Sequence, residues 1–572
     1  MELSNRAREQ YEAWLLDQMI DDQTRQELQQ LEGNTAEIED RFYKDLQFGT
    51  GGLRGVIGAG TNRMNEYTVG RATQGLAQYI LQSGEQPHSM VIAYDSRHRS
   101  REFAVETALV MAGNGILAYV FESLRPTPEL SFAVRHLQAS AGVVVTASHN
   151  PPEYNGYKVY GSDGCQLVPD MAEQVIAEIA GVSSFSQVRK LSREEAEKEQ
   201  LLIWIGEAVD EAFIQEVVSV SRNPQIIQEM NEQFKVVYTP LHGAGFMPVN
   251  QVLLRAGFTH VLGVAEQNSP DPNFSTVKSP NPEEKEAFTL AIELAKKENA
   301  DLIIGTDPDC DRMGAVVKDA NGEYTVLSGN QAGAIMTNYL LSSMKERGEL
   351  PENGALIKTI VTSEMGAEIA KSFGVHIFNT LTGFKYIGEK MTQFEQNGDY
   401  VFLFGYEESY GYLAGSYARD KDAVVASLLI SEAAAYYKHQ GKTLPDVLDS
   451  LYQQYGYFQE SLVSRTLKGK DGVATIQNIM KHWRENAPQA VGDMKIAEMK
   501  DYEPGIDGLP PENVLKYVLD DGSWFCLRPS GTEPKIKIYF AVQGADKKTA
   551  VKKMQQLAET VMAVVDGVIH IN

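Results

Sequence analysis

Three acidic side chains alternate in one short segment of the sequence. Asp307, Asp309 and Asp311 follow an apolar run that is typical of a buried strand. Carboxylates at every second position of such a loop can converge on one point, where they repel one another unless a hard cation lies between them. The pattern predicts a Mg²⁺ site, with a solvated acidic turn as the alternative. Arg312 and Lys318 stand where an EF-hand needs Gly and Glu, so that calcium motif is excluded.

A second segment places a serine and a histidine directly after the apolar run 143–145. Ser148 at the exit of a buried strand would be exposed and rigidly held, which suits a nucleophile or a carrier of phosphate. His149 beside it is a candidate for moving a proton. The following Asn-Pro pair is also common in ordinary turns, so both interpretations stay open on these residues alone.

The segment 528–534 predicts an anion site. A guanidinium, two hydroxyls and a glycine that lets backbone N–H groups approach would form a compact nest for a phosphate dianion, and they come from Arg528, Ser530, Gly531 and Thr532. The alternative is a plain turn rich in Pro and Gly. The glycine-rich segment 49–55 contains Arg54 but lacks the spacing of a Walker loop.

Polar residues after the apolar run 400–404 could hold a sugar. Glu407, Glu408 and Ser409 offer two acceptors and a hydroxyl for sugar hydroxyl groups. The segments 382–385 and 419–422 also carry polar and charged residues, and each could equally be a solvated surface stretch.

Apolar runs of strand length alternate with helical patterns in three passes, at 89–146, 234–306 and 328–404. Such alternation predicts α/β units whose parallel strands are covered by helices. The tail differs, because the runs 514–519 and 524–528 flank Asp521-Gly522, a pair that predicts a β-hairpin with a primed turn. The last region is therefore expected to be a small α+β domain.

The composition limits the classes of partner. A chain of 572 residues should hold three or four domains, since about 150 residues per domain is a reasonable prior. Its 77 acidic and 52 basic residues give a net charge of −25, which argues against nucleic-acid and anionic-membrane partners. Three cysteines favour a reducing compartment, and the sequence has no signal-peptide pattern and no apolar run of about 20 residues. We expect a cytoplasmic protein, either a monomer or a small homo-oligomer.

Together the segments resemble the α-D-phosphohexomutase superfamily, in the order of that family and over nearly the whole chain. Its four loops correspond to 146–151 (phosphoserine), 307–312 (metal), 407–409 (sugar) and 528–532 (phosphate). Residues 151–158 and 382–385 look most like the longer bacterial α-phosphoglucomutases, which are similar to the phosphopentomutase and glucose 1,6-bisphosphate synthase branch. The resemblance implies three similar mixed α/β domains and a C-terminal α+β domain around a central cleft, at 1–205, 206–322, 323–455 and 456–572.

The resemblance also implies roles for single residues. Ser148 would be phosphorylated and would ligate Mg²⁺ together with Asp307, Asp309 and Asp311. Positive charge around the phosphoserine would come from Arg54, Lys158 and Arg312, and the candidates for proton transfer are His149 and Lys421. The substrate would be held by Thr382, Gly383, Lys385, Glu407, Ser409, Arg312, Arg528, Ser530, Gly531 and Thr532.

The reaction implied by the resemblance interconverts glucose 1-phosphate and glucose 6-phosphate through glucose 1,6-bisphosphate, so the partners would be small sugar phosphates. Phosphopentomutase or phosphomannomutase activity on the same scaffold is an alternative. A different enzymatic interpretation makes Asp307 the nucleophile, as in haloacid-dehalogenase-type phosphotransferases, and leaves the Ser148 segment without a role. A third interpretation is a phosphosugar-binding protein without activity.

Overall fold

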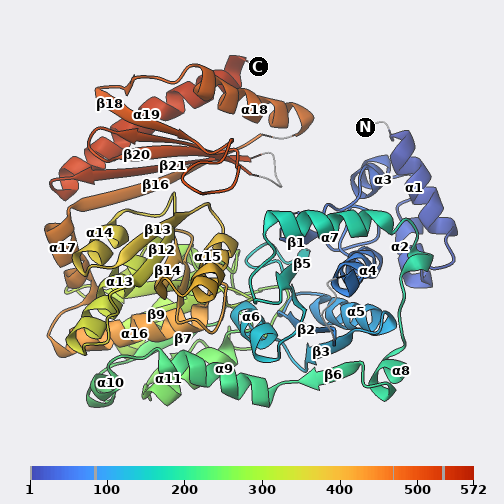
Figure 1. Ribbon diagram of the computed structural model, residues 1–572, viewed down its shortest axis with the longest axis horizontal. Helices are drawn as coiled ribbons and strands as arrows, with labels where there is room; N and C mark the ends of the chain where they lie inside the picture. Colours follow the sequence, from blue (N-terminus) through green and yellow to red (C-terminus); the bar gives the residue numbers. More distant parts are fainter. Residues whose placement is uncertain (1–2, 50, 83–86, 468, 531–534, 572) are drawn as a thin grey trace.

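The structure is a computed structural model that describes residues 3–49, 51–82, 87–467, 469–530 and 535–571. Four sheets follow one another along the chain, each with its own helices. We name these regions domains I to IV, after the four predicted ranges. In Figure 1 the chain runs from domain I on the right through domain II below to domain III on the left, and domain IV lies above domain III.

Domain I is a mixed α/β domain. Its sheet has the order β1-β5-β4-β2-β3-β6, in which the neighbours from β4 to β6 are parallel, β5 is antiparallel to β4, and β1 is antiparallel to β5. The central strands are buried on both faces, which explains their unbroken apolar sequence. The strands are β1 (Gly52–Val56), β2 (Ser89–Tyr94), β3 (Leu117–Phe121), β4 (Ala141–Val145), β5 (Tyr154–Gly161) and β6 (Leu202–Ile205). The helices beside them are α4 (Glu66–Gln82), α5 (Ser100–Gly113), α6 (Thr127–His136), α7 (Pro169–Gly181), η1 (Phe185–Gln187) and α8 (Arg193–Lys198).

Three short helices precede this sheet and lie on the outer side of domain I (Figure 1). They are α1 (Asn5–Leu16), α2 (Asp22–Gln29) and α3 (Thr35–Phe42), and each begins at a side chain that caps its first turn. The buried Trp14 ring packs edge-on against Phe42, Tyr67 and Phe185, with ring centroids 5.3–5.7 Å apart. This aromatic cluster packs the N-terminal helices against the rest of domain I.

Domain II has a five-stranded sheet in the order β11-β10-β9-β7-β8. The strands β9, β7 and β8 are parallel, β10 is antiparallel to β9, and β11 is antiparallel to β10. The strands are β7 (Val236–Thr239), β8 (Val261–Gly263), β9 (Leu302–Thr306), β10 (Met313–Lys318) and β11 (Tyr324–Val326), so this sheet continues beyond residue 322. The helices are α9 (Glu207–Ser219), α10 (Pro224–Met230), α11 (Phe246–Ala256), η2 (Lys285–Phe288) and α12 (Thr289–Glu298).

Domain III has four strands in the order β13-β12-β14-β15, and only β15 is antiparallel to its neighbour. They are β12 (Gly354–Thr359), β13 (His376–Thr380), β14 (Val401–Glu407) and β15 (Gly411–Ala414). The helices are α13 (Gly329–Glu346), α14 (Met365–Ser372), α15 (Phe384–Asn397), α16 (Ala423–His439) and α17 (Leu444–Tyr455). Helix α16 is buried from Ala423 to Tyr437, because it packs on helices of domain II as well as on α13. One hydrophobic core therefore runs through domains I to III.

Domain IV is an antiparallel sheet in the order β16-β21-β20-β19-β18-β17, with two helices on the face away from domain III (Figure 1). Its strands are β16 (Tyr457–Thr466), β17 (Ala490–Val491), β18 (Met494–Asp501), β19 (Leu515–Leu519), β20 (Trp524–Pro529) and β21 (Lys535–Gly544), and its helices are α18 (Gly469–Glu485) and α19 (Lys547–Ile571). The expected three α/β domains and C-terminal α+β domain are confirmed. Within the described part of the chain, no helix is both long and apolar enough to cross a bilayer.

The predicted hairpin between β19 and β20 is present, but its primed turn is wrong. The Gly522 N–H donates to the Leu519 carbonyl (2.9 Å), and the Leu519 N–H donates to the Ser523 carbonyl (2.7 Å). Gly522 has a φ of 82°, whereas Asp521 keeps a negative φ. A primed turn would need positive φ at Asp521 as well. An ordinary turn closed by a glycine bulge leaves only the residue without a Cβ in the left-handed region.

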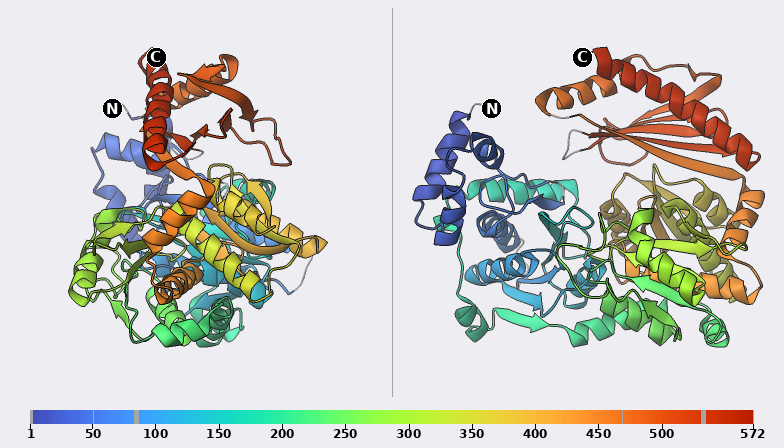
Figure 2. Two further views of the ribbon diagram at one scale, coloured as in Figure 1. Left: turned by 90° about the vertical axis from the view of Figure 1, so that its left-hand side faces the viewer. Right: turned by 180° about the vertical axis from the view of Figure 1, so that it is seen from behind.

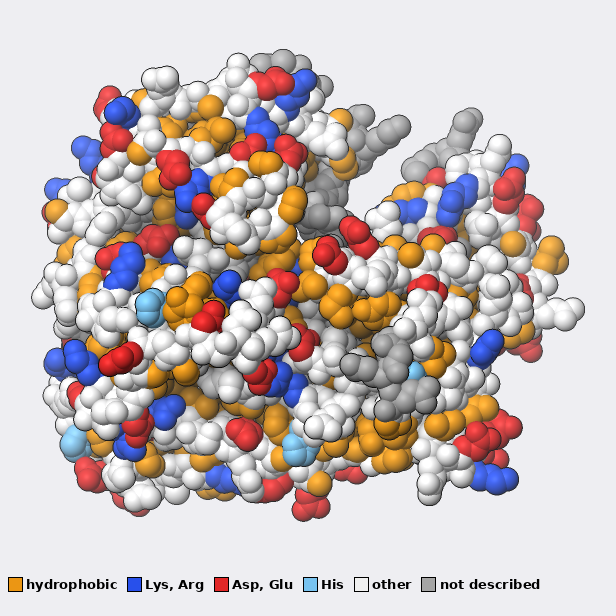
Figure 3. All heavy atoms as spheres, viewed as in Figure 1, with side chains coloured by type: hydrophobic (Ala, Val, Ile, Leu, Met, Phe, Trp, Pro, Cys, Tyr) orange, Lys and Arg blue, Asp and Glu red, His pale blue; other side chains and the backbone are white. Residues whose placement is uncertain are grey.

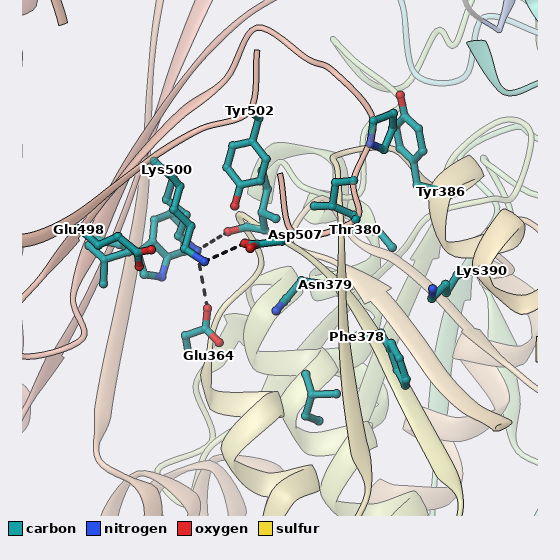
Figure 4. Close-up of a pocket in the computed structure, with 18 of the residues that line it drawn as sticks. Glu364, Phe378, Asn379, Thr380, Tyr386, Lys390, Glu498, Lys500, Tyr502 and Asp507 are labelled. Atoms are coloured by element: carbon teal, nitrogen blue, oxygen red, sulfur yellow. Dashed lines mark hydrogen bonds and ion pairs between the residues drawn. The ribbon is translucent and has the colours of Figure 1, made fainter. Parts of the chain in front are cut away.

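Domain IV rests on domain III through a separate apolar cluster. Ile360, Val361, Leu381 and Tyr386 of domain III pack there against Tyr502, Val514, Trp524, Cys526, Tyr539 and Ala541 of domain IV. A cavity of about 710 Å³ lies beside this contact, and its walls include Glu364, Thr380, Tyr386, Lys500, Tyr502 and Asp507 (Figure 4). The described residues that line this cavity include no predicted site residue, so we do not assign the substrate to it.

The predicted loops lie at the carboxyl ends of strands in all four domains: 146–151 follows β4, 307–312 follows β9, 407–409 starts at the last residue of β14, and 528–530 includes the last two residues of β20. The ends of strands in open α/β sheets are the usual place for ligands. The space-filling view shows the surface hollowed between domain IV and the N-terminal helices of domain I (Figure 3). In the ribbon seen from behind, domain IV and these helices again lie apart along the same edge of the molecule (Figure 2).

We expect Trp14→Ala to loosen the N-terminal helices selectively. Removing a buried Trp costs about 3–5 kcal/mol of stability, and here the loss falls on the aromatic cluster that fastens α1 to domain I. Hydrogen exchange should rise across residues 5–42 and stay unchanged in domains II to IV. Leu16→Ala on the same helix is the matched control, because Leu16 is 80% exposed. Equal exchange in the two variants would contradict the assignment.

Candidate active site

Ser148 lies in a buried turn at the carboxyl end of β4. Its φ is 52°, a left-handed conformation that residues with a Cβ rarely adopt, and it is 4% exposed. Its N–H donates to Thr146 Oγ1 (2.8 Å), and its Oγ donates to Asp307 Oδ2 (2.7 Å). The turn therefore directs the serine hydroxyl at the first carboxylate of the acidic loop in domain II.

The acidic loop 307–312 turns sharply between β9 and β10. Asp307 Oδ1 accepts the N–H groups of Asp311 (3.1 Å) and Arg312 (3.0 Å), which closes the turn. Cys310 at its tip has a φ of 53°. As a result, one carboxylate oxygen from each of the three aspartates lies within 4.8 Å of the others.

Two lysines from the neighbouring domains reach this loop. Lys158 of β5 donates to Asp309 Oδ2 (2.7 Å) and Asp311 Oδ2 (3.2 Å), and Lys421 Nζ of domain III lies 3.3 Å from Asp311 Oδ2. Burial alone would lower the pKa of each lysine, but the facing carboxylates outweigh that effect and raise both pKa values. Both lysines are charged at neutral pH.

The three aspartates are suited to hold a divalent cation. Burial and the neighbouring carboxylates of Asp309 and Asp311 raise the pKa of Asp307 well above its usual range. Among the described residues, no hydrogen bond reaches Asp309 Oδ1 or Asp311 Oδ1, although both atoms are buried. Arg312 Nε lies 3.8 Å from Asp311 Oδ1, a long ion pair without a hydrogen bond. Buried carboxylate oxygens without hydrogen bonds are costly unless a hard cation binds them. The cluster could therefore bind a metal ion next to Ser148 Oγ.

His149 and Arg54 complete the surroundings of Ser148. His149 Nδ1 lies 3.2 Å from Ser148 Oγ. Burial, together with the positive charges of Arg312 and Arg54, lowers the pKa of His149 to about 3, so the ring is neutral at neutral pH. Arg54 Nη1 donates to Asn150 Oδ1 (3.3 Å) in the loop that carries the serine.

Arg312 connects the acidic loop to the 407–409 loop of domain III. Its Nη1 donates to the Ser409 carbonyl (3.1 Å) and to Glu283 Oε1 (2.7 Å). Glu407 Oε1 accepts the N–H of Gly383 (2.8 Å) and lies within charge range of Arg312 and Lys421. The two loops of domain III therefore meet beside the acidic loop.

Glu408 does not join this group. Glu408 lies one residue beyond the end of β14, in the turn that leads to β15, and its hydrogen-bond partners differ from those of Glu407. Its Oε2 accepts long hydrogen bonds from Thr359 (3.4 Å) and Thr362 (3.3 Å). Burial and the charge of Glu407 raise the pKa of Glu408 to about 7. Of the two acceptors expected from the sequence, only Glu407 faces the site.

Residues 382–385 lead into helix α15, whose first residue is Phe384. Gly383 has a φ of 124°, which only glycine adopts without strain, and its N–H thereby reaches Glu407. Thr382 Oγ1 is buried, and no hydrogen bond reaches it from the described residues. Burial lowers the pKa of Lys385, whose Nζ lies 5.0 Å from the ring centroid of Tyr386.

Arg528 and Ser530 come from domain IV. Arg528 Nε donates to Glu512 Oε1 (3.2 Å), and the Ser530 N–H donates to the Lys535 carbonyl (2.7 Å). Arg528 is close enough to Lys385 for their charges to interact. Hydrogen bonds and ion pairs connect the predicted residues of domains I, II and III with one another. Within the described ranges, Arg528 of domain IV interacts with these residues through charge alone, by way of Lys385. Gly531 and Thr532 lie outside the described residues.

Three residues that contact the site were not predicted from the sequence. Thr127 donates from Oγ1 to Asp309 Oδ2 (2.8 Å) and from its N–H to the Asp309 carbonyl (2.9 Å). Arg97 donates to the Ser148 carbonyl (2.5 Å), and Glu283 holds Arg312. Thr127 and Arg97 follow β3 and β2, which lie in the same sheet as β4, so polar residues at these strand ends were the available signal. Glu283 lies in an irregular segment and carries no such signal.

Four domain families match the chain in the order of its domains. Their descriptions are phosphoglucomutase/phosphomannomutase alpha/beta/alpha domain I (residues 45–185), domain II (211–322), domain III (328–455) and the C-terminal domain (467–558). The matches reach from the glycine-rich Arg54 segment to the middle of α19 and leave out the N-terminal helices.

Curated relatives and solved structures agree with these matches. A phosphoglucomutase of Staphylococcus haemolyticus is 39% identical over 517 residues, 88% of this chain and 91% of its own. One of Staphylococcus epidermidis is 40% identical over 511 residues, 87% of this chain and 90% of its own.

Among solved structures, the Paramecium phosphoprotein pp63/parafusin (phosphoglucomutase) has a TM-score of 0.70 at 18% identity and covers 92% of this chain and 96% of its own. A putative phosphomannomutase of Thermus thermophilus has a TM-score of 0.68 at 21% identity, covering 91% and 99%. These two structures show the fold. The four domain matches and the staphylococcal relatives show that the chain belongs to the phosphoglucomutase/phosphomannomutase family of the α-D-phosphohexomutase superfamily.

Proposed function

We propose that this enzyme is a phosphoglucomutase that interconverts α-D-glucose 1-phosphate and glucose 6-phosphate. The observation that carries the proposal is the buried contact of Ser148 Oγ with Asp307 Oδ2 (2.7 Å), because it sets a potential phosphate carrier against an acidic cluster suited to a cation. The names of the staphylococcal relatives support the choice of substrate.

In the proposed reaction Ser148 Oγ carries a phosphoryl group in the resting enzyme. The 6-hydroxyl of glucose 1-phosphate attacks the phosphorus, a new O–P bond forms, and the bond to Ser148 Oγ breaks. The product, glucose 1,6-bisphosphate, turns end for end and returns its 1-phosphoryl group to Ser148, which releases glucose 6-phosphate. Because an enzyme that has lost its phosphate can be reloaded from the bisphosphate, the same compound serves as intermediate and activator.

Asp307, Asp309 and Asp311, with an oxygen on Ser148, would hold Mg²⁺. When bound, the ion neutralises charge on the transferring phosphoryl group. Lys158, Arg312 and Arg54 add fixed positive charge on the other sides of the serine, where it stabilises the same negative charge without moving during the reaction.

The proton roles follow from position and charge. His149 Nδ1 is 3.2 Å from Ser148 Oγ and neutral, so we assign it the proton that leaves or returns to the serine. Lys421 carries its proton because Asp311 and Asp420 stabilise the charge despite burial, which suits a donor to the sugar oxygen when the bisphosphate returns its phosphoryl group. That return step leaves His149 protonated and Lys421 uncharged. In the first half-reaction His149 then gives its proton to Ser148 Oγ as the O–P bond breaks, and Lys421 takes the proton of the attacking sugar hydroxyl.

One pocket must accept the sugar in two orientations. Glu407 and Ser409 would hold the 3- and 4-hydroxyls, which are common to both orientations. The phosphate that does not react would bind Arg528, Ser530, Gly531 and Thr532 of domain IV. Thr382, Gly383 and Lys385 of domain III would line the substrate site between the sugar-binding residues and domain IV. Closure of domain IV over the ligand would exclude water, which protects the phosphoserine from hydrolysis.

A phosphopentomutase or phosphomannomutase remains the alternative on this scaffold. The interpretation with Asp307 as nucleophile loses support, because Oδ1 of this residue accepts two backbone N–H groups and Oδ2 accepts the Ser148 hydroxyl. Attack by Oδ1 would break the acidic turn, and attack by Oδ2 would break its hydrogen bond with Ser148.

Ser148→Ala should lower turnover by at least about 10³-fold while calorimetry still detects binding of glucose 1-phosphate, since the nucleophile is lost and the sugar contacts remain. Incubation of the wild-type enzyme with labelled glucose 1,6-bisphosphate should give one acid-stable phosphopeptide that contains Ser148. Ser450→Ala on the exposed face of α17 is the control. Label that is lost in mild acid would indicate an aspartyl phosphate and refute the serine assignment.

Thr127→Val should weaken metal binding by about 10–100-fold, because the hydroxyl that orients the Asp309 carboxylate is lost and the shape is kept. Titration of the metal-free protein with Mg²⁺ or Mn²⁺ by calorimetry gives the affinity directly. Thr107→Val is matched to it, since Thr107 is equally buried and its hydroxyl donates to the Phe103 carbonyl of α5 (2.8 Å), away from the three aspartates. The same affinity in both variants would speak against a metal at the three aspartates.

Substrate choice is tested by kcat/KM for glucose 1-phosphate, mannose 1-phosphate and ribose 1-phosphate with added glucose 1,6-bisphosphate. We expect glucose 1-phosphate to be turned over best. Glu407→Gln should lower its kcat/KM by about 10–100-fold, since a charge-assisted hydrogen bond to the sugar becomes a neutral one. Ribose 1-phosphate turned over as well as or better than glucose 1-phosphate would make the protein a phosphopentomutase instead.

A further inference from the structure

Arg97 is a buried residue at the carboxyl end of β2 with one unusual set of partners. Its side chain has no exposed surface. Nη1 donates to the carbonyls of Pro151 (2.8 Å) and Tyr154 (3.1 Å), and Nη2 donates to those of Ser148 (2.5 Å) and Asn150. A single guanidinium thus gathers four carbonyl groups of the loop that carries Ser148.

The N–H side of Ser148 is held by the same unit. Asp95 Oδ2 lies 3.4 Å from Arg97 Nε and accepts the hydroxyl of Thr146 (2.6 Å). Thr146 Oγ1 in turn accepts the Ser148 N–H (2.8 Å). Both backbone groups of Ser148 are therefore fixed by the Asp95–Arg97 pair, one directly and the other through Thr146.

This fixing matters because Ser148 has a φ of 52°. A residue with a Cβ keeps the left-handed conformation only when its surroundings impose it. In an extended conformation the Cα–Cβ bond would point elsewhere, and Oγ would leave Asp307, which it now reaches at 2.7 Å. Lysine cannot replace this clamp, because one ammonium group lacks the planar fork that meets four separate carbonyls.

The other face of the guanidinium touches domain II. The central carbon of Arg97 lies 5.0 Å from the ring centroid of Phe274, a buried residue of that domain. Next to it, His98 Nε2 lies 2.8 Å from Asn273 Oδ1. Arg97 is thus packed between the loop that carries the serine and the domain that carries the three aspartates.

We infer that Arg97 is a positioning residue for phosphoryl transfer, which sets the conformation of the Ser148 loop and its distance from the acidic loop without touching the substrate. The inference rests on the proposed function, since it assumes that Ser148 carries the phosphoryl group. Removal of the clamp misplaces the nucleophile and leaves the sugar contacts of domains III and IV intact.

The test compares Arg97→Lys with Arg63→Lys. Arg63 is also buried in domain I. It donates to the carbonyls of Asp40 in α3 and Asn62 in the segment between β1 and α4, and neither segment contains a predicted site residue. We expect Arg97→Lys to lower kcat per phosphorylated enzyme by about 10²-fold, the loss typical of a misplacement of about 1 Å. KM should change by less than about threefold and Tm should match that of Arg63→Lys. In Arg97→Lys alone, the isolated phosphoenzyme should also transfer its label to glucose 1-phosphate more slowly in a single turnover.

Chemical rescue separates positioning from folding. In Arg97→Gly, added ethylguanidinium should restore single-turnover transfer, and ethylammonium at the same concentration should not, since only the former can meet the four carbonyls. Phe274→Leu provides a milder variant if the Arg97 variants are insoluble, and its transfer rate should fall with KM unchanged.

An Arg97→Lys enzyme with wild-type kcat, or with a loss explained entirely by lower Tm or fewer phosphorylated molecules, would overturn the inference, as would Phe274→Leu with a wild-type transfer rate. Failure of the proposed function is distinguishable, because the wild-type enzyme itself would then show neither a Ser148 phosphopeptide nor mutase turnover.

Discussion

The arrangement of this protein depends on neutralising three carboxylates that are buried in one six-residue loop. The loop belongs to domain II, but the lysines that pair with it come from domain I (Lys158) and domain III (Lys421). Buried like charges are strongly unfavourable unless such partners are in place. The loop is therefore stable only in the assembled body of three domains. Helix α16 starts two residues after Lys421 and is buried between domains II and III, so the apolar core and the charge pairing require the same arrangement.

Fixing these groups costs backbone strain at two points. Ser148 and Cys310 both follow buried strands and both adopt left-handed φ, at about 1–2 kcal/mol per residue. In each turn, hydrogen bonds to the backbone offset this strain. The N–H groups of Asp311 and Arg312 close the acidic turn on Asp307, and Arg97 with Thr146 closes the serine turn. Hydrogen bonds to the backbone of each loop thus hold the serine hydroxyl and the carboxylates in place before any ligand arrives. This limits the rearrangement needed during phosphoryl transfer.

The sequence indicated the strands and the loops that follow them, because both signals are local. The apolar runs before Ser148 and Asp307 are β4 and β9 in the structure, and the alternating acids do converge. What escaped prediction depends on partners distant in the chain. Arg97 meets its acceptors 51 to 57 residues away, and Thr127 meets Asp309 182 residues away. Glu408 was expected to act together with Glu407, but it lies in the turn after β14 and accepts hydrogen bonds from Thr359 and Thr362, 49 and 46 residues away. The prediction of a primed turn was wrong for a local reason, because a glycine bulge at Gly522 closes the hairpin without a positive φ at Asp521.

The net charge of −25 and an anionic substrate are compatible because electrostatic interactions in solution are short-ranged. Exposed charges more than about 8 Å apart are largely screened at physiological ionic strength. Lys158, Lys421 and Arg312 lie in or against the acidic loop, out of bulk solvent, where screening is weak. The two lysines pair with Oδ2 of Asp309 and Asp311. Oδ1 of each accepts no hydrogen bond from the described residues, although Arg312 Nε lies 3.8 Å from Asp311 Oδ1, and a divalent cation bound there would tip the local balance of charge further. A sugar phosphate is therefore recognised at contact distance, and the acidic surface, which repels anions in general, restricts binding to ligands that reach this cluster.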